Sequence, residues 1–327
     1  MVGFGLGLIP VIIILALLFS SSEDLKVEDN YKPVILPNGN DVRKKLSKDS
    51  PVILKLNVQG VIGLDELTSS SISDQLTESR EGALKSDRVK AVLVYINTPG
   101  GTVTDSNGIY QAIKSYKERH EVPVYAYIDG LCASGGMYVA SACDKIFANN
   151  ASIVGSVGVL SPTMFNAHQL MEKIGVESKT ITAGKNKDAM NPFRPWKPGE
   201  EENIQSVIQA FYEQFVDLVV ENRPNMDREK LVDEYGANIF DADKAVELGY
   251  IDQSNTSLND TIKALTTELG IKDDYYQVVE MESKIWYRGL IKGCSPIFTG
   301  KIQHEISGFP ELAPEFRNQF LYLYQPE

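Results

Sequence analysis

Apolar stretches alternate with amphipathic stretches through the middle of the chain. Residues 52–58 pass from an apolar run to strict alternation, and residues 89–96 and 122–128 carry similar apolar runs. Apolar runs of this length, bounded by turn residues, are typical of buried strands. The stretches 73–87 and 105–117 between them are amphipathic and predict helices. This alternation predicts an α/β domain built on a mainly parallel sheet.

The flanking patterns set the expected limits of this domain. An amphipathic stretch at 200–221 and a helix–strand unit at 241–252 complete it, so we expect the domain to span residues 50–255. Residues 23–49 are polar and contain chain-breaking residues, which predicts a tether before the domain. Residues 256–327 are expected to form a C-terminal extension, which ends in an irregular aromatic tail and to which the pattern assigns no role.

Residues 1–22 predict a transmembrane anchor. Residues 2–19 contain no charged side chain, and as a helix they would reach ~27 Å, close to the thickness of the hydrocarbon layer. A cleaved secretion signal is the alternative, since Ser20–Ser22 could form a processing site, but the positive residues that usually open such a signal are missing. The acidic pair Glu23–Asp24 gives little positive charge to hold the following chain in the cytoplasm. We therefore expect the domain outside the cytoplasm.

Composition narrows the class of protein further. Of the 327 residues, 43% are hydrophobic and 23% are charged, which excludes a disordered chain and a multi-span membrane protein. The 32 basic and 44 acidic residues give a net charge of −12, and the one basic run, Arg43–Lys45, is too short to follow a phosphate backbone. Nucleic acid is therefore not expected as a partner.

Cysteine and histidine usage argues against disulfide and metal chemistry. The chain contains three cysteines and three histidines, namely Cys132, Cys143, Cys294, His120, His168 and His304. No two cysteines form a CxxC pair, and no two histidines lie three to five residues apart. We expect neither a disulfide framework nor a metal site, and we expect the cysteines to act as small buried side chains.

Two turns that contain paired glycines follow predicted strands. The first, Asn97–Gly101, comes directly after the strand at 89–96, and the second, Cys132–Gly136, comes after the strand at 122–128. Glycines let backbone N–H groups approach a ligand without side-chain obstruction. In parallel sheets, ligand sites gather at the carboxyl ends of the strands. We therefore expect the chemistry of the protein at these two turns.

Ser134 lies in the second turn, at or near the amino terminus of the apolar stretch 137–143. Its hydroxyl would face the partial positive charge of a helix amino terminus, and the N–H of Gly135 could stabilise an oxyanion. A helix cap is the alternative role, since serine often caps helices. The two glycines after Ser134 weaken a first helical turn, which is unexpected of a cap alone. Ser134 is thus a candidate nucleophile.

A serine nucleophile needs a base, because the neutral hydroxyl reacts poorly. Histidine is the usual base, but His168 falls in the ordinary amphipathic stretch 166–175, His120 precedes a strand and His304 lies in the tail. A lysine can replace it when burial lowers the lysine pKa from ~10.4 far enough for the amine to accept a proton. The residues alone do not say which lysine would serve.

Four motifs in order resemble the signal peptide peptidase A family, over about residues 50–255. They are Asn97-Thr98-Pro99-Gly100-Gly101, Asp129-Gly130 through Ala133-Ser134-Gly135-Gly136, Gly155-Ser156-Val157-Gly158-Val159, and Gly184-Lys185-Asn186-Lys187-Asp188 leading to Pro192. The family contains serine peptidases with a Ser-Lys dyad. Its fold of repeated strand-strand-helix units is shared with Clp protease subunits and crotonases, so the resemblance implies that fold here.

The resemblance implies a catalytic role for three side chains. The family nucleophile falls on Ser134, the base falls on Lys187, and the serine that helps to position the lysine falls on Ser156. The spacing between nucleophile and base, 187 − 134 = 53, is similar to that of the family. Lys185 is the nearest rival base, and only the resemblance selects Lys187.

The resemblance also implies an oxyanion hole. It falls on backbone N–H groups at Gly100 or Gly101 and at Gly135. Two departures accompany it: the family usually has serine where Thr98 stands, and Asn191 replaces a serine before the proline near the lysine. Neither removes a proposed catalytic group.

These implications give an expected function. The protein would be a membrane-anchored serine endopeptidase that cleaves signal-peptide remnants or other apolar peptides through an acyl-enzyme, without a cofactor. It would reside in a bacterial cytoplasmic membrane and form a homo-oligomer whose neighbouring subunits share sites. Two alternatives remain, a catalytically silent membrane scaffold of the same fold and a crotonase-like acyl-CoA enzyme. The sequence places no carboxylate in the site that could serve as the base of a crotonase-like enzyme.

Overall fold

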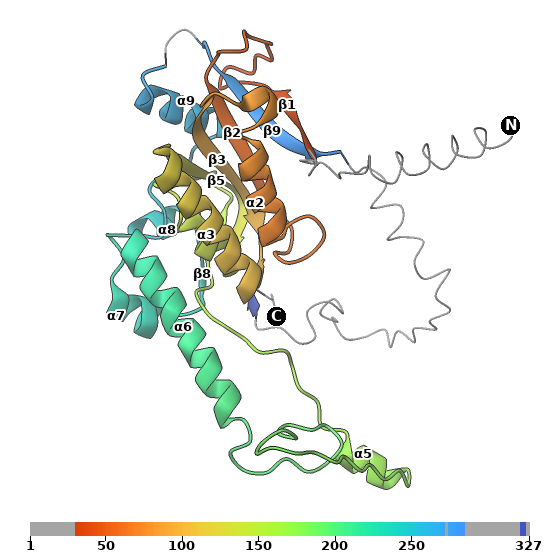
Figure 1. Ribbon diagram of the computed structural model, residues 1–327. Helices are drawn as coiled ribbons and strands as arrows, with labels where there is room; N and C mark the ends of the chain where they lie inside the picture. The colour runs from red at the N-terminus through yellow and green to blue at the C-terminus, as the bar shows by residue number, and fades with distance from the viewer. Residues whose placement is uncertain (1–29, 272–273, 285–320, 325–327) are drawn as a thin grey trace, which may run out of the picture.

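A computed structural model describes residues 30–271, 274–284 and 321–324. In this part of the chain, one sheet of eight strands organises the molecule (Figure 1). Its strands, in order across the sheet, are β1 (Tyr31–Leu36), β9 (Gln277–Ser283), β2 (Val52–Gln59), β3 (Val89–Thr98), β5 (Val124–Ala133), β7 (Ile153–Gly155) and β8 (Ile239–Asp241), with β6 (Lys145–Ala148) paired to β5. The pairs among β9, β2, β3, β5, β6 and β7 are parallel, whereas β1–β9 and β7–β8 are antiparallel. The mainly parallel α/β sheet predicted from the sequence is therefore confirmed.

Helices cover both faces of the sheet. The helices of the described residues are α2 (Ser69–Glu78), α3 (Val103–His120), α4 (Gly135–Ala140), α5 (His168–Lys173), α6 (Glu202–Asn222), α7 (Arg228–Lys230), α8 (Ala242–Glu247) and α9 (Leu258–Glu268), with the short turns η1 (Gly82–Leu84) and η2 (Leu231–Tyr235). Of these, α5 lies away from the sheet (Figure 1). The predicted central strands and the long helices are present. The helix expected at 73–87 begins earlier, because the Thr68 side chain accepts a hydrogen bond from Ser71 N and caps it, and it ends at Glu78.

Alternation along β2 separates two cores. Val52, Leu54 and Leu56 join the larger apolar cluster, which includes Ile72 of α2 and Ile109 of α3. Ile53 points to the opposite face and joins a smaller cluster with Ile262 and Leu265 of α9. Because successive residues of a strand face opposite sides, a central strand covered on both sides must be apolar at nearly every position.

Two strands at one side of the sheet lie outside the domain limits expected from the sequence. Residues 31–36, expected as part of the tether, form β1, and residues 277–283 of the expected extension form β9. Pro33 made the first segment look unstructured, but β1 is an edge strand, where a residue without an N–H is tolerated. β9 presents Val278 and Val279 to the cores and inserts between β1 and β2.

A long excursion separates β7 from α6. Residues 161–201, called the arm here, contain α5 and reach well away from the sheet (Figure 1). The long helix α6 returns the chain from the arm to the body. Phe215 and Val219 in the second half of α6 are buried in the larger core and anchor the helix there.

The predicted transmembrane anchor, residues 1–22, lies outside the described residues. Within residues 30–271, 274–284 and 321–324, none of the helices combines the length and the apolar character needed to span a bilayer.

Candidate active site

The first glycine turn is fixed by the Thr98 hydroxyl. Thr98 is fully buried at the end of β3, where its Oγ1 donates to Gly60 O (2.5 Å) and accepts from Gly100 N (3.0 Å). The threonine therefore keeps the hydroxyl that serine supplies at this position in the family. Because this internal bond occupies the N–H of Gly100, that group is not available as an oxyanion donor in this geometry.

Gly101 presents its peptide groups to the other side of the turn. It lies in the short strand β4 (Gly100–Thr102), where Ile62 N donates to Gly100 O (2.8 Å) and Thr102 N donates to Ile62 O (3.0 Å). Peptide groups alternate in direction along a strand, so those of Gly101 face away from Ile62. Only glycine fits here, since an added Cβ would lie 1.8 Å from Ile62 O.

Ser134 occupies a strained position between β5 and α4. Its backbone has φ 53° and ψ −114°, a conformation that costs a non-glycine residue of the order of 1–3 kcal/mol. Ser134 N donates to Gly155 O (2.9 Å) and Ser134 O accepts from Tyr138 N (3.0 Å), which hold the turn in place. Its side chain makes no capping hydrogen bond to α4 or to any other described residue. The alternative role as a helix cap is therefore wrong.

Gly135 brings the two turns together. It is the first residue of α4, so its N–H has no acceptor within the helix. An added Cβ on Gly100 would lie 2.6 Å from Gly135 N, which shows how closely the turns approach. The Gly100 turn therefore lies against Gly135, the residue that follows Ser134.

Ser106 of α3 lies at the same place and was missed from the sequence. An added Cβ on Gly135 would lie 2.4 Å from Ser106 Oγ. This hydroxyl is buried without a hydrogen-bond partner among the described residues. Nothing in the helical pattern around Ser106 marked it, because only the packing of α3 against α4 brings it to the turn.

Ser156 is attached to the Ser134 turn through its neighbour. Gly155 accepts the bond from Ser134 N, and Ser156 follows directly with its own N–H donating to Asn238 O (2.7 Å). Ser156 is 6% exposed and also has a positive φ of 57°. The loop after β7 therefore lies against the candidate nucleophile.

Lys187 lies on the arm. It is exposed, its backbone N–H donates to Gly184 O (3.3 Å), and its side-chain amine has no partner among the described residues. The rival Lys185 is exposed in the same turn. Because the arm reaches away from the sheet (Figure 1), the single chain brings neither lysine into hydrogen-bond contact with Ser134.

Arg194 braces the turn that carries Lys187. Its Nε donates to Asp188 Oδ2 (2.6 Å), and its Nη2 donates to Glu200 Oε1 (2.7 Å). Hydrogen bonds from Arg194 hold the pKa of Asp188 below its ordinary 3.8 and the pKa of Glu200 below its ordinary 4.5. The same carboxylates raise the pKa of Arg194. Three residues spread along the arm are thereby tied together.

The end of the chain also reaches the site, which the sequence did not predict. The short strand β10 (Leu321–Leu323) pairs antiparallel with β4, and Tyr324 N donates to Pro99 O (2.7 Å). On its other side, Leu321 exchanges two hydrogen bonds of 3.1 Å with Leu160. Gly100 and Gly101, on which the predicted oxyanion hole falls, are therefore paired with β10 of the same chain.

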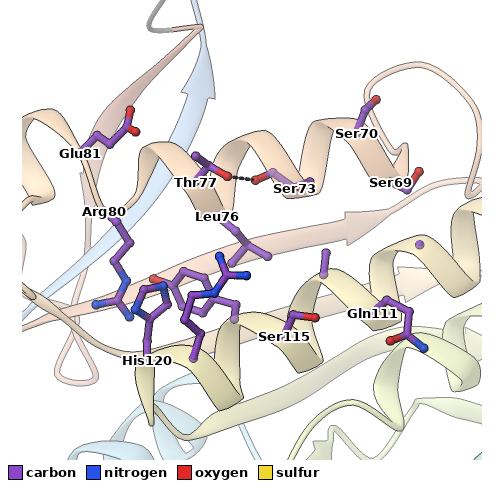
Figure 2. A pocket seen from close by; sticks show the side chains of 14 residues that line it. Ser69, Ser70, Ser73, Leu76, Thr77, Arg80, Glu81, Gln111, Ser115 and His120 are labelled. Atoms are coloured by element: carbon purple, nitrogen blue, oxygen red, sulfur yellow. Dashed lines mark hydrogen bonds between the residues drawn. The ribbon is translucent and has the colours of Figure 1, made fainter. Parts of the chain in front are cut away.

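Two other features lie away from this site. Cys132 and Cys143 are free and buried, as expected, and burial raises the pKa of Cys143 to about 12; Cys294 lies outside the described residues. A surface cleft between α2 and α3 is lined by Arg80, Ser115 and His120 among others (Figure 2). This cleft contains none of the predicted site residues.

A strained serine beside glycine amides, on a mainly parallel α/β sheet, is the arrangement of a serine peptidase with a Clp protease-like fold. The Clp protease family matches residues 42–160, and peptidase family S49 matches residues 116–272. A signal peptide peptidase SppA-like protein of Enterococcus faecium is 32% identical over 287 residues, which cover 83% of this chain and 81% of that protein. The chain therefore belongs to peptidase family S49, the signal peptide peptidase A family.

Two further comparisons extend the range of similar proteins. A protease-like protein of Synechocystis sp. is 36% identical over 210 residues, which cover 64% of this chain and 74% of that protein. Among solved structures, a point mutant of ClpP1 from Listeria monocytogenes is similar with a TM-score of 0.42 and 17% identity, covering 66% of this chain and 96% of that one.

Proposed function

We propose that this protein is a membrane-anchored serine endopeptidase that cleaves apolar peptides, such as the remnants of signal peptides, with Ser134 as nucleophile and Lys187 as base. The observation that carries the proposal is the strained turn of Ser134, whose next residue, Gly135, lies against the turn of Gly100 and Gly101. The anchor at residues 1–22 would hold the site near the membrane, where such peptides are left behind. Membership of a peptidase family favours this chemistry over acyl-CoA chemistry.

The proposed reaction is acyl transfer in two stages. Lys187 takes the proton of the Ser134 hydroxyl, and Ser134 Oγ attacks the carbonyl carbon of the peptide. The N–H groups of Gly101 and Gly135 stabilise the oxyanion, and losing one such donor typically costs about 3–4 kcal/mol of barrier. The C–N bond breaks and the leaving amine receives the proton. Water then hydrolyses the ester and restores the serine.

We infer that the base comes from a neighbouring copy of the chain. Lys187 is exposed on the arm, which extends away from the Ser134 turn of its own chain. The arm also exposes large apolar side chains that a neighbour would cover, namely Phe165, Leu170, Ile174, Ile181 and Phe193. Packing the arm against the next copy in a ring would remove both Lys187 and this apolar surface from water. Ser156, beside the Ser134 turn, would then accept or donate a hydrogen bond at the lysine.

The test compares the full chain in mild detergent with three single variants, using quenched apolar peptides. Ser134→Ala and Lys187→Ala should abolish cleavage, whereas Lys185→Ala, a matched exposed lysine of the same turn, should leave it nearly unchanged. Each variant is checked for its unfolding temperature and oligomeric state. Cleavage that persists in Ser134→Ala would sink the assignment of the nucleophile. An assembled wild-type protein that cleaves no peptide would favour the alternative of a catalytically silent membrane scaffold.

A further inference from the structure

The cleft between α2 and α3 is basic at one end. Its volume is about 690 Å³, in the range of pockets that bind small molecules, and Figure 2 shows Arg80 and His120 side by side at that end. Arg119 also lines the cleft. Glu81 is the only acidic residue that lines it in the described part of the chain, and its side chain points away from the Arg80 guanidinium (Figure 2). In a chain of net charge −12, this local excess of positive charge favours an anionic ligand.

The Arg80 guanidinium has one unpaired side. Its Nη1 donates to Asp87 Oδ1 (2.7 Å), whereas Nε and Nη2 are buried and have no hydrogen-bond partner among the described residues. The N–H groups of Nε and Nη2 lie on the same side of the guanidinium and form a fork, called the Arg80 fork here, that matches two oxygens of a phosphate. A buried charged donor without an acceptor is destabilising. The Arg80 fork therefore fits an anion from outside this part of the chain.

Tyr116 and Asp87 fix the position of this guanidinium. The buried ring of Tyr116 lies against it, with 4.7 Å between Arg80 Cζ and the ring centroid, and the Tyr116 hydroxyl shares a hydrogen bond with Ser79 Oγ (2.9 Å). Asp87 holds Nη1 and also pairs with Lys90 (2.7 Å). Because the arginine is already held in one conformation, an anion that binds to it would cost little further side-chain entropy.

His120 lies next to the Arg80 fork. It is the last residue of α3, and its ring packs against the ring of Tyr116, with 4.7 Å between the centroids. Burial, and then the charges of Arg80 and Arg119, lower the pKa of His120 from its ordinary 6.5, so its ring is neutral at neutral pH. A neutral side chain at the end of a helix can turn aside at little electrostatic cost, which would open the fork to the cleft.

Hydroxyl side chains line the rest of the cleft. They come from α2 on one side and from α3 on the other, and they include Ser70, Ser73, Thr77 and Ser115 (Figure 2). These four side chains are exposed. Hydroxyl groups both donate and accept hydrogen bonds, so this part of the cleft suits a ligand that carries hydroxyl groups itself. A small polyol with a phosphate at one end meets the requirements of both parts of the cleft.

The chain arrives from the proposed membrane anchor at this same end of α2. Glu78 lies two residues before Arg80, and its carboxylate accepts from Asn30 N (2.8 Å) and from Tyr31 N (3.0 Å). Asn30 is eight residues beyond residue 22, the expected end of the anchor, and an extended chain of that length reaches at most about 28 Å. The cleft would therefore stay close to the head groups of the membrane that holds the anchor.

We propose that the cleft between α2 and α3 binds the phosphate ester of a small polyol, such as glycerol phosphate. The phosphate lies on the Arg80 fork and on Arg119, the ring of His120 turns aside to admit it, and the polyol lies along the hydroxyl side chains. This chemistry occurs free in solution and in the head group of phosphatidylglycerol, so the ligand is a soluble phosphate ester or a lipid. The site lies apart from Ser134 and does not depend on the proposed reaction.

Calorimetric titration of the full chain in mild detergent tests the site, with glycerol phosphate as the probe. Wild-type protein should bind one molecule per chain, more tightly than inorganic phosphate, and should not bind glycerol. Arg80→Lys keeps the charge but loses the fork, so binding should weaken at least about tenfold. Arg119→Gln should weaken it by a similar factor. Lys230→Gln, at an exposed lysine of α7, is the matched control and should bind like wild type.

Two further variants test the details of the site. His120→Ala removes no charge at neutral pH, so it should bind glycerol phosphate at least as tightly as wild type, and a loss of about tenfold would overturn the movement assigned to His120. Ser73→Ala combined with Ser115→Ala should weaken the binding of glycerol phosphate but not that of inorganic phosphate. Wild-type protein that binds no glycerol phosphate, or folded Arg80→Lys and Arg119→Gln variants that bind it normally, would overturn the site.

The full chain in lipid nanodiscs distinguishes the two sources of the ligand. For a lipid ligand, adding phosphatidylglycerol to phosphatidylcholine discs should raise the unfolding temperature of wild type but not that of Arg80→Lys. For a soluble ligand, only added glycerol phosphate should raise it. Wild-type protein that neither compound stabilises would overturn the proposal. Peptide cleavage should be unchanged in Arg80→Lys, so this outcome would leave the proposed peptidase function standing.

Discussion

Single hydroxyl groups decide the geometry of the glycine turns. Thr98 Oγ1 joins two backbone groups, Gly60 O and Gly100 N, and the Gly100 N–H would otherwise be buried without a partner. It thereby occupies the amide of Gly100 and leaves that of Gly101 to face β10. A residue that carries no proposed chemical step thus determines which amide can act on an oxyanion.

Replacing Thr98 by valine should damage both stability and activity. Valine keeps the shape but leaves the buried N–H of Gly100 unpaired, so we expect a loss of about 1–3 kcal/mol in the free energy of unfolding. The displaced turn should lower kcat/KM by about 10- to 100-fold. Thr98→Ser is the matched control, because it keeps the hydroxyl and should retain most activity. Urea unfolding and peptide cleavage measure the two effects, and wild-type values for Thr98→Val would contradict this role.

Elements outside the sheet position the remaining chemistry. The arm has little regular structure, and its only helix among the described residues is the short α5. Arg194 compensates by joining Asp188 and Glu200 across the turn of Lys187. Ion pairs between side chains therefore stabilise this part of the arm, whereas backbone hydrogen bonds between strands stabilise the sheet.

The arm should loosen in acid. Arg194 depresses the pKa values of Asp188 and Glu200, so their contribution is present above the ordinary values of 3.8 and 4.5 and is lost as the pH falls through the depressed values. Limited proteolysis should therefore cut the arm faster below about pH 4 than at neutral pH, while the sheet stays protected.

Arg194 variants separate this effect from general acid unfolding. Arg194→Gln should open the arm at neutral pH and remove most of the dependence on pH, whereas Arg194→Lys keeps the charge but loses the forked contact and should lie between. An Arg194→Gln arm as resistant to protease as the wild-type arm would contradict the brace.

At the scale of the whole molecule, the dyad of Ser134 and Lys187 that we propose would form between two copies of the chain. Ser134 lies in the body of the chain and Lys187 on the arm, so the two proposed partners belong to parts that are separated within one subunit. Activity should then depend on assembly, and dilution that dissociates the oligomer should reduce it.

Mixed assemblies test the shared site. Ser134→Ala copies supply Lys187, and Lys187→Ala copies supply Ser134, so coexpression of the two inactive variants should restore sites at some interfaces. In a ring assembled at random from equal amounts, about a quarter of the sites would be complete. Peptide cleavage by the copurified mixture measures this recovery. Mixed oligomers with no activity above either variant alone would show that the dyad does not form between copies.

Local patterns were sufficient for the central fold and for the two turns. β2, β3 and β5 are apolar because the sheet is covered on both faces, and the glycines after β3 and β5 mark places where backbones approach closely. These features depend on residues near one another in the sequence, where side-chain periodicity carries the information. The glycines that follow Ser134 were enough to select it as a candidate, but no feature of the sequence indicated its strained backbone conformation.

Only the tertiary structure decided which distant segments of the chain pack beside the central strands and the glycine turns. β1, β9 and β10 pair with strands far away along the chain, and pairing of this kind leaves no local pattern in the sequence. In the sequence, Tyr322 is one of several aromatic residues in an irregular tail. Only the structure shows that its ring contacts Tyr138 and Phe215. The sequence by itself determined the sheet and the glycine turns. The pairing of β10 with β4 and the contacts of Tyr322 with Tyr138 and Phe215 arise from long-range packing, which only the folded chain specifies.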